Sequence, residues 1–272
     1  MGSAPLTKPQ LTCVTFTADI RCVMHKVFGR EGLEARFQRR LPCFAVGYSA
    51  GGTMLIMGIA QELQLMEGQT TTPHMHPEGF PFECCVCLSA PYDMATHAAS
   101  MLTRVGRLLY QAPLVTALRK YTHKHRAVLV GGLPGVPQVT DRTVDAFMAR
   151  LKTVEDFDEH VVAPHFGYKC VEDYYADGSL FKWLPHLHTI PVVCAAARDD
   201  PVTGHSLRTA DWQRLVDHTN PNVAYVETPT GGHLGYMLGP VDEWRTAPCF
   251  LDHFPVDCID HLVAAKAADP SL

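Results

Sequence analysis

Ser49 is the residue whose setting best suits a nucleophile, because it is the centre of a Gly-x-Ser-x-Gly pentapeptide between an apolar run and an apolar helical pattern. A strand that turns sharply into a helix strains such a serine and exposes its hydroxyl at the end of a sheet. Flanking side chains would collide in that turn, so we expect it to require Gly47 and Gly51. The pattern predicts attack on a carbonyl carbon, with the backbone N–H of Ala50 facing the oxyanion.

A serine hydroxyl is a weak nucleophile that needs a base, and the base needs a carboxylate to orient it. Asp199 and Asp200 follow the apolar run 191–197, and we prefer Asp200 because a proline comes directly after it. His233 stands in a Gly-Gly-His-Leu-Gly stretch after the apolar run 222–227. The predicted constellation is therefore Ser49, Asp200 and His233, with Asp199 as the alternative acid. A glycine-rich turn and a turn-capping Asp without chemical roles are the structural alternatives.

The elements that would position these residues alternate between strand and helix. Helical patterns occupy residues 18–28, with Thr17 as the cap, and residues 52–65 and 207–218. Such alternation predicts an α/β fold with a mostly parallel sheet. The predicted strands are the short apolar runs 42–46, 82–88, 191–197 and 222–227.

The segment between the second and third predicted strands breaks this alternation. It holds helical patterns near 97–110, 113–124 and 141–152 and no clear strand. We therefore expect a helical cap insertion at about 95–182, within an α/β domain that spans residues 1–262. Residues 67–81 are expected to form a loop and residues 263–272 a loose C-terminal tail.

Composition and charge exclude several classes of protein. The chain has 272 residues, of which 47% are hydrophobic, so it is not intrinsically disordered. Its net charge of −5 and dispersed basic residues argue against a nucleic-acid partner. No apolar run reaches the roughly 18 residues that cross a bilayer, and the start has no secretory pattern. We expect a cytoplasmic protein and leave peripheral contact with a membrane open.

Three other clusters could do chemistry, but each has a simpler interpretation. The ten cysteines are predicted to be mostly buried free thiols, and the C-x-x-C at 84–87 lies inside a predicted strand rather than at a helix start. The histidines at 74 and 76 have no third ligand nearby, so no metal site or cofactor is expected. The acidic cluster 156–159 is predicted to be a helix N-terminus, with a catalytic carboxylate pair as the alternative.

Taken together, these motifs resemble the YheT-type branch of the α/β hydrolases, which includes mammalian lipid-handling abhydrolases and yeast medium-chain ethyl-ester synthases. The resemblance extends from about residue 11 to 262 and implies the α/β-hydrolase fold. It also implies Ser49 as nucleophile, Asp200 as acid, His233 as base and lipid-like acyl esters as substrates. The matching stretches are VGYSAGGTML (46–55), SAPYDM (89–94), DFDE (156–159), APHFGY (163–168), EDYY (172–175), DDP (199–201) and GGHLGY (231–236).

The chain departs from this family before Ser49. Family members have several strands there and a His-Gly loop that supplies a second oxyanion donor, whereas no His-Gly pair precedes Ser49 here. Loss of one such donor can reduce the rate by ~10²–10³. We therefore expect an N-terminally truncated domain in which the strand 42–46 presents an apolar edge, open to self-association.

The sequence thus predicts a serine carboxylic-ester hydrolase acting on small-molecule acyl or lipid esters. Transfer of the acyl group to an alcohol, rather than to water, is left open, as are the acyl chain length and the head group. Two alternatives remain. One is a lipid-binding protein that has lost turnover, and the other is an interaction protein whose sheet edge pairs with a partner.

Overall fold

A computed structural model describes residue 6 and residues 8–67, 80–204, 220–236 and 249–269. Within these residues the sheet has four strands, all parallel, in the order β1-β2-β3-β4. The four predicted strands are confirmed, each with its ends shifted by no more than two residues. They are β1 (Cys43–Tyr48), β2 (Phe82–Leu88), β3 (Val192–Ala197) and β4 (Val223–Thr228).

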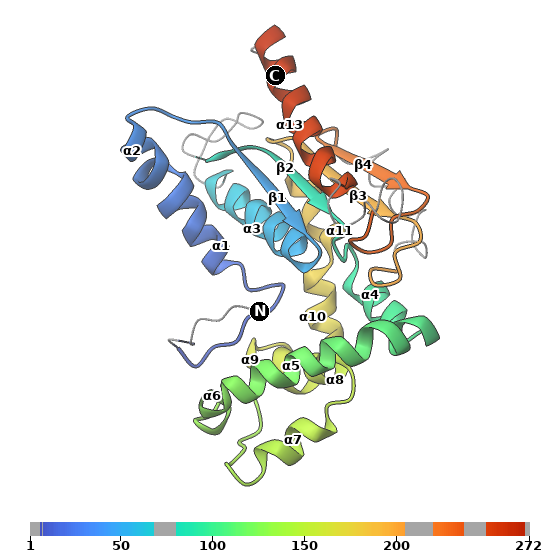
Figure 1. Ribbon diagram of the computed structural model, residues 1–272. Coiled ribbons are helices and arrows are strands. Elements are labelled where there is room, and N and C mark those ends of the chain that lie inside the picture. Colours follow the sequence, from blue (N-terminus) through green and yellow to red (C-terminus); the bar gives the residue numbers. More distant parts are fainter. Residues whose placement is uncertain (1–5, 7, 68–79, 205–219, 237–248, 270–272) are drawn as a thin grey trace.

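Helices cover both faces of the sheet (Figure 1). α3 (Ala50–Glu67) packs on one face with α1 (Ala18–Val23) and α11 (Leu180–Trp183). α13 (Phe250–Ala268) covers the other face. Side chains alternate between the two cores along β2, because successive residues of a strand point to opposite faces: Cys85 and Cys87 pack towards α3, and Val86 and Leu88 towards α13.

Two short π-helical turns and a helical turn complete the N-terminal part. Contacts with Glu62 hold this part against α3. The side chains of Arg21 and His25 both contact Glu62 at 2.8 Å. Thr17 is the N-cap residue of α1, as predicted, but its hydroxyl donates to the side chain of Gln61 rather than to an N–H of the helix. These elements are η1 (Met24–Phe28), η2 (Arg30–Glu34) and α2 (Ala35–Phe37).

Between β2 and β3 the structure describes every residue and contains helices but no strand, as predicted. The helix expected at 97–110 is divided into two helical segments, one ending at Met101 and the next beginning at Gly106, where a Cβ would lie 2.4 Å from the carbonyl oxygen of Ser100. In Figure 1 most of these helices form a layer below the sheet, whereas α11 packs on one of its faces beside α3. Besides α11 they are α4 (Met94–Met101), η3 (Gly106–Gln111), α5 (Ala112–Lys124), α6 (Arg126–Val130), α7 (Val144–Arg150), α8 (Val154–Phe157), η4 (Asp158–Val162), α9 (Ala163–His165), α10 (Val171–Gly178) and η5 (Leu184–His186).

The segment before α1 packs against this helical layer, which the sequence did not indicate. Leu11 and Cys13 are buried in its hydrophobic core. The N–H of Leu11 donates to His165 Nε2 at 3.2 Å, and the N–H of Val14 donates to the Tyr174 hydroxyl at 3.4 Å. These contacts bring the segment close to the end of the sheet where β1 meets α3.

The C-terminal prediction needs correction. Residues 263–268, expected to be part of a loose tail, are the last turns of α13. They are rich in Ala, a strong helix former, and Lys266 makes an ion pair with Glu83 of β2 at 2.7 Å. Among the described helices, none is both long and apolar enough to cross a membrane.

The exposed sheet edge and several predicted segments can be compared with the structure only in part. β1 is an edge strand among the described residues, and its Val46 and Tyr48 are 36% and 40% exposed. Self-association through this edge stays a prediction. The helix expected at 207–218, most of the loop at 67–81 and the histidines at 74 and 76 lie outside the described residues.

Candidate active site

Ser49 is the single residue between β1 and α3, and its backbone has the strained conformation expected of a sharp strand-to-helix turn. Its φ is 52°, a left-handed value that is costly for a residue with a side chain. Hydrogen bonds hold the turn in place: the N–H of Ser49 donates to the carbonyl of Leu88 at 2.9 Å. The N–H of Gly52 in turn donates to the Ser49 carbonyl at 2.9 Å.

Two glycines make this turn sterically feasible, and one of them differs from the prediction. A Cβ at Gly47 would lie 2.6 Å from the Cα of Gly52, and a Cβ at Gly52 would lie 2.5 Å from the Sγ of Cys87. A Cβ at Gly51 would meet nothing within 4 Å. The expectation for Gly47 is confirmed, but that for Gly51 is wrong, because residue 51 faces open space while residue 52 packs against β2.

The structure brings the three predicted side chains together at the C-terminal ends of the strands. Ser49 Oγ lies 2.8 Å from His233 Nε2, and His233 Nδ1 lies 2.9 Å from Asp200 Oδ2. Asp200 follows β3 and His233 follows β4. Because all strands are parallel, their carboxyl ends share one edge of the sheet, and the following loops meet there.

Asp200 is held in place by more than the histidine. Its Oδ1 accepts hydrogen bonds from the N–H groups of Val202 at 2.8 Å and Thr203 at 3.1 Å. Burial acts to raise the pKa of Asp200, but the hydrogen bonds from His233 and these two N–H groups outweigh it and keep the pKa below its ordinary value. The carboxylate is therefore ionised at neutral pH, which favours a proton on His233 Nδ1 and leaves Nε2 free to accept from Ser49.

Asp199, the alternative acid, has a different partner. Its Oδ1 accepts a hydrogen bond from the N–H of Gly232 at 2.8 Å. Gly232 has a φ of 60° and directly precedes His233, so this contact ties the histidine loop to the end of β3. The geometry gives Asp199 a part in positioning the loop and Asp200 the contact with the imidazole.

Ala50 is the first residue of α3, so its N–H has no acceptor within the helix. It lines the same cavity as Ser49 and His233. An N–H at a helix start carries part of the positive end of the helix dipole, which suits a developing oxyanion. The oxyanion role of Ala50 stays a prediction.

The cavity beside Ser49 has a volume of about 490 Å³ and lies between the end of the sheet and the helical layer. Apolar side chains form most of its wall, including Met54, Met94, Leu114 and Val162. The size and lining of the cavity suit a hydrocarbon chain attached to a group that reacts at one end.

His97 and Asp158 are polar side chains of this cavity that were not among the predicted catalytic residues, although Asp158 belongs to the acidic cluster 156–159. The ring of His97 contacts the carbonyl of Val202 through Nδ1 at 2.7 Å, and burial lowers the pKa of His97, so its imidazole is neutral at pH 7. Asp158 accepts a hydrogen bond from the Tyr175 hydroxyl at 3.1 Å, and burial raises its pKa to about 7. Neither residue lies in a recognisable sequence motif, because the residues that they contact, Val202 and Tyr175, are distant from them in the sequence.

The neighbours of Asp158 have structural contacts. Asp156 forms a reciprocal capping box with Thr153, as expected for a helix N-terminus, and Glu159 accepts from the N–H of Val171 at 2.8 Å. The acidic cluster 156–159 therefore divides into capping residues and one carboxyl group that reaches the cavity.

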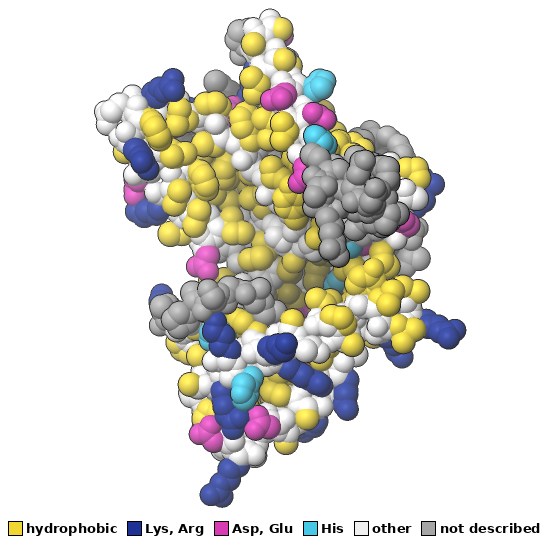
Figure 2. Space-filling model, viewed as in Figure 1, with side chains coloured by type: hydrophobic (Ala, Val, Ile, Leu, Met, Phe, Trp, Pro, Cys, Tyr) yellow, Lys and Arg dark blue, Asp and Glu magenta, His cyan; other side chains and the backbone are white. Residues whose placement is uncertain are grey.

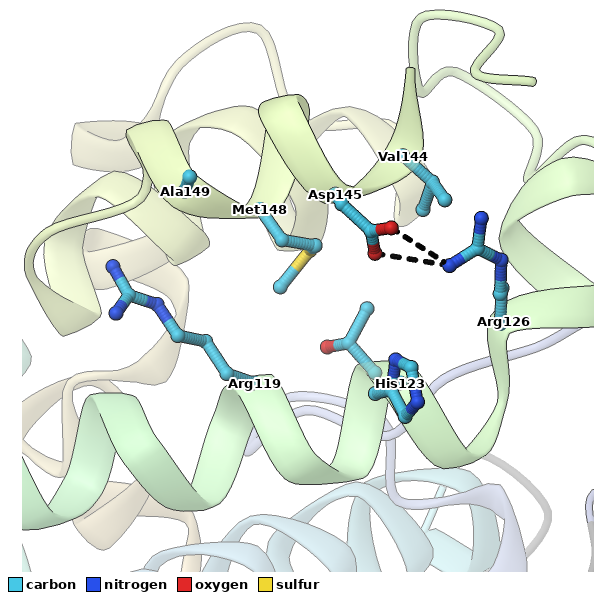
Figure 3. A pocket seen from close by; sticks show the side chains of 8 residues that line it. Arg119, His123, Arg126, Val144, Asp145, Met148 and Ala149 are labelled. Atoms are coloured by element: carbon cyan, nitrogen blue, oxygen red, sulfur yellow. Dashed lines mark hydrogen bonds and ion pairs between the residues drawn. The ribbon is translucent and has the colours of Figure 1, made fainter. Parts of the chain in front are cut away.

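A second, smaller cavity of about 260 Å³ lies between α5 and α7 (Figure 3). Its charged groups are engaged: Arg126 donates to both oxygens of Asp145 at 2.9 and 3.1 Å, and Arg119 donates to the carbonyl of Leu151 at 2.7 Å. Thr122, its only lining hydroxyl, donates to the carbonyl of Leu118 at 2.8 Å. This cavity therefore has no activated nucleophile.

None of the ten cysteines forms a disulfide, as predicted, and five are buried, including those of β2, whereas Cys22 is exposed. Burial raises the pKa of Cys84 to about 11 and holds that of Cys85 and Cys87 well above its ordinary value, so these thiols are not ionised at neutral pH. Among the described residues, no group of three or more His, Cys, Asp or Glu side chains is arranged to hold a metal ion.

Comparison with known proteins places this site in context. No family model matches the chain. It is 28% identical over 234 residues to a monoacylglycerol lipase of Saccharomyces cerevisiae, covering 85% of this chain and 45% of the relative. It is 29% identical over 242 residues to phospholipase ABHD3 of Mus musculus, covering 88% and 49%. The chain thus spans about half the length of the curated relatives it matches.

The parallel sheet, the strained serine turn and these relatives together indicate the fold. The chain has the α/β-hydrolase fold. Among solved structures it is similar to mouse alpha/beta hydrolase domain-containing protein 10, with 14% identity over 97% of this chain and 74% of that chain, and a TM-score of 0.43. The YheT-type branch within the α/β hydrolases stays a prediction.

Proposed function

We propose that this protein is a serine carboxylic-ester hydrolase that acts on acyl or lipid esters. The observation that carries the proposal is the series of hydrogen bonds from Ser49 Oγ to His233 Nε2 at 2.8 Å and from His233 Nδ1 to Asp200 Oδ2 at 2.9 Å. An ionised carboxylate, an oriented imidazole and a strained, cavity-facing serine are what nucleophilic attack on an ester requires.

In the first half of the reaction, Ser49 Oγ bonds to the ester carbonyl carbon while its proton moves to His233 Nε2. The negative charge on the carbonyl oxygen is stabilised by the N–H of Ala50, and the charge of Asp200 stabilises the imidazolium. The C–O bond to the leaving alcohol then breaks, and His233 gives its proton to the alcohol oxygen. The product left on the enzyme is an acyl ester of Ser49.

In the second half, water attacks the acyl carbon and gives a proton to His233. The bond to Ser49 Oγ breaks, the proton returns to Oγ, and the carboxylic acid leaves. An alcohol in place of water would yield a new ester by the same steps, and this is the acyl-transfer variant of the proposal.

The substrate class rests on the apolar cavity and on the relatives. A cavity of about 490 Å³ with a mostly apolar wall favours an acyl chain over a charged or sugar-like group. The relatives named as monoacylglycerol lipase and phospholipase are consistent with glycerol-based lipid esters.

The test is covalent labelling with a fluorophosphonate probe, combined with hydrolysis of p-nitrophenyl esters of increasing acyl length. We expect labelling and turnover in the purified chain and loss of both in Ser49→Ala. Ser179→Ala is the matched control, since the Ser179 hydroxyl contacts the carbonyl of Tyr92 and does not line the cavity. Fatty-acid binding without labelling would overturn the enzymatic proposal and favour the lipid-binding alternative.

A further inference from the structure

One edge of the helical layer exposes large apolar side chains to solvent. We call residues 104–114 the cap edge; they run from the end of α4 through η3 into α5. Leu108 and Leu109 are 70% and 61% exposed, and Val105 and Leu114 are also exposed. Scattered exposed hydrophobic residues are ordinary, but four in one short segment form a patch that indicates an interaction surface.

This patch is continuous with the cavity beside Ser49. Leu109 and Leu114 are exposed at the surface and also line the cavity, together with Tyr110 and Pro113. Apolar side chains therefore extend from the outside of the cap edge into the cavity that contains the candidate nucleophile. A hydrocarbon chain could follow these side chains into the cavity.

Positive charge accompanies the patch, although the whole chain has a net charge of −5. Residues 94–140 contain no Asp or Glu. Arg104 and Arg107 are exposed beside Val105 and Leu108, and neither makes an ion pair with a described acidic residue. In Figure 2, Lys and Arg side chains border hydrophobic ones along the helical layer. The basic residues of this stretch are Arg104, Arg107, Arg119, Lys120, Lys124 and Arg126.

We propose that the cap edge is a docking surface for anionic lipid membranes. In this arrangement Leu108 and Val105 enter the boundary between headgroups and acyl chains, and the two arginines contact lipid phosphates. Exposed apolar side chains flanked by basic ones are typical of segments that lie in a membrane interface. A protein partner on the same surface would cover Leu109 and Leu114 and close the cavity, whereas a membrane would present acyl esters to it.

Membrane binding itself does not depend on catalysis, but delivery of substrate through the cap edge rests on the proposed hydrolase function. The experiment therefore measures binding directly, by flotation of the full chain with vesicles of phosphatidylcholine, with and without phosphatidylserine. We expect the protein to float with phosphatidylserine vesicles and much less with phosphatidylcholine alone. Added salt should weaken the binding, since the contacts with headgroups are electrostatic.

The decisive variant is Val105→Asp/Leu108→Asp, neither residue of which lines the cavity. Its matched control is Val256→Asp/Val263→Asp on α13, where the valines are 53% and 48% exposed and the same two charges are added. We expect the first variant to lose at least about tenfold in vesicle partitioning and the control to lose much less. Arg104→Gln and Arg107→Gln should each reduce partitioning by about fivefold.

A second measurement separates the two proposals. Hydrolysis of a short, water-soluble ester by Val105→Asp/Leu108→Asp should match that of the wild type, which also shows that the variant is folded. Flotation of an inactive chain would leave the docking surface intact and remove only the hydrolase. Failure of the wild type to float with phosphatidylserine vesicles, or equal losses in both double variants, would overturn the docking proposal.

Discussion

Replacing Asp200 by Asn, and separately Asp199 by Asn, tests which of these two adjacent carboxylates orients His233. The amide oxygen of Asn can still accept from the N–H groups of Val202 and Thr203, so the loop after β3 should keep its conformation. The amide NH2 would then face His233 Nδ1, which must become an acceptor and leave the proton on Nε2. An Nε2–H cannot accept the Ser49 proton, so the general base is lost while the fold is retained.

The magnitude follows from this change of tautomer. An Asn at the orienting position of a serine triad lowers kcat by about 10⁴, which corresponds to about 5.4 kcal/mol at about 1.36 kcal/mol for each tenfold step. Asp199→Asn is the matched control. Its amide oxygen can still accept from the Gly232 N–H, and the weaker neutral hydrogen bond should reduce kcat by less than about tenfold.

The assay is the initial rate of p-nitrophenyl butyrate hydrolysis, normalised to the folded fraction measured by circular dichroism. Asp200→Asn should fall about 10⁴-fold below the wild type, Ser49→Ala should fall further, and Asp199→Asn should stay close to the wild type. An Asp200→Asn rate within about tenfold of wild type, or an equal loss in Asp199→Asn, would refute the assignment of the acid.

Three further predictions concern stability, measured by urea denaturation. Gly52→Ala should lower the free energy of unfolding by about 1–3 kcal/mol, because the new Cβ would lie 2.5 Å from a buried sulfur, whereas Gly51→Ala should be neutral or slightly stabilising. Similar losses in both variants would contradict the steric argument. Burial raises the pKa of Asp158 from 3.8 to about 7, so the wild type should lose up to about 4 kcal/mol of stability as the pH rises from about 4 to 7. Asp158→Asn should flatten this slope, and an unchanged slope would exclude Asp158 as its source. Burial acts to raise the pKa of Glu62, but Arg21 and His25 outweigh it and lower the pKa, so its contribution is lost on acidification below its ordinary value of 4.5. Glu62→Gln should therefore lose less stability than the wild type between about pH 5 and 3, and a steeper loss would count against this ion pair.

Much of the fold could be predicted because its signals are local. Each strand is a short apolar run bounded by turn residues, and each was located to within two residues. The serine turn was recognisable because a glycine, a strand before it and a helix after it are all adjacent in the sequence. A serine, an acid and a histidine that follow predicted strands in this chain order narrowed the candidates to Ser49, His233 and the neighbouring Asp199 and Asp200, since parallel strands bring the following loops to one edge.

What only the tertiary structure decided depends on contacts between distant residues. The sequence favoured Asp200 over Asp199 only because a proline follows it, and the folded turn determines which carboxylate faces Gly232 and which faces His233. It favoured Gly51 over Gly52, since the close approach of α3 to Cys87 arises from packing against a different strand. The same holds for His97 and Asp158, which line the cavity because of how the helices between β2 and β3 pack over the end of the sheet. Sequence periodicity predicts such helices but not how they pack against distant elements.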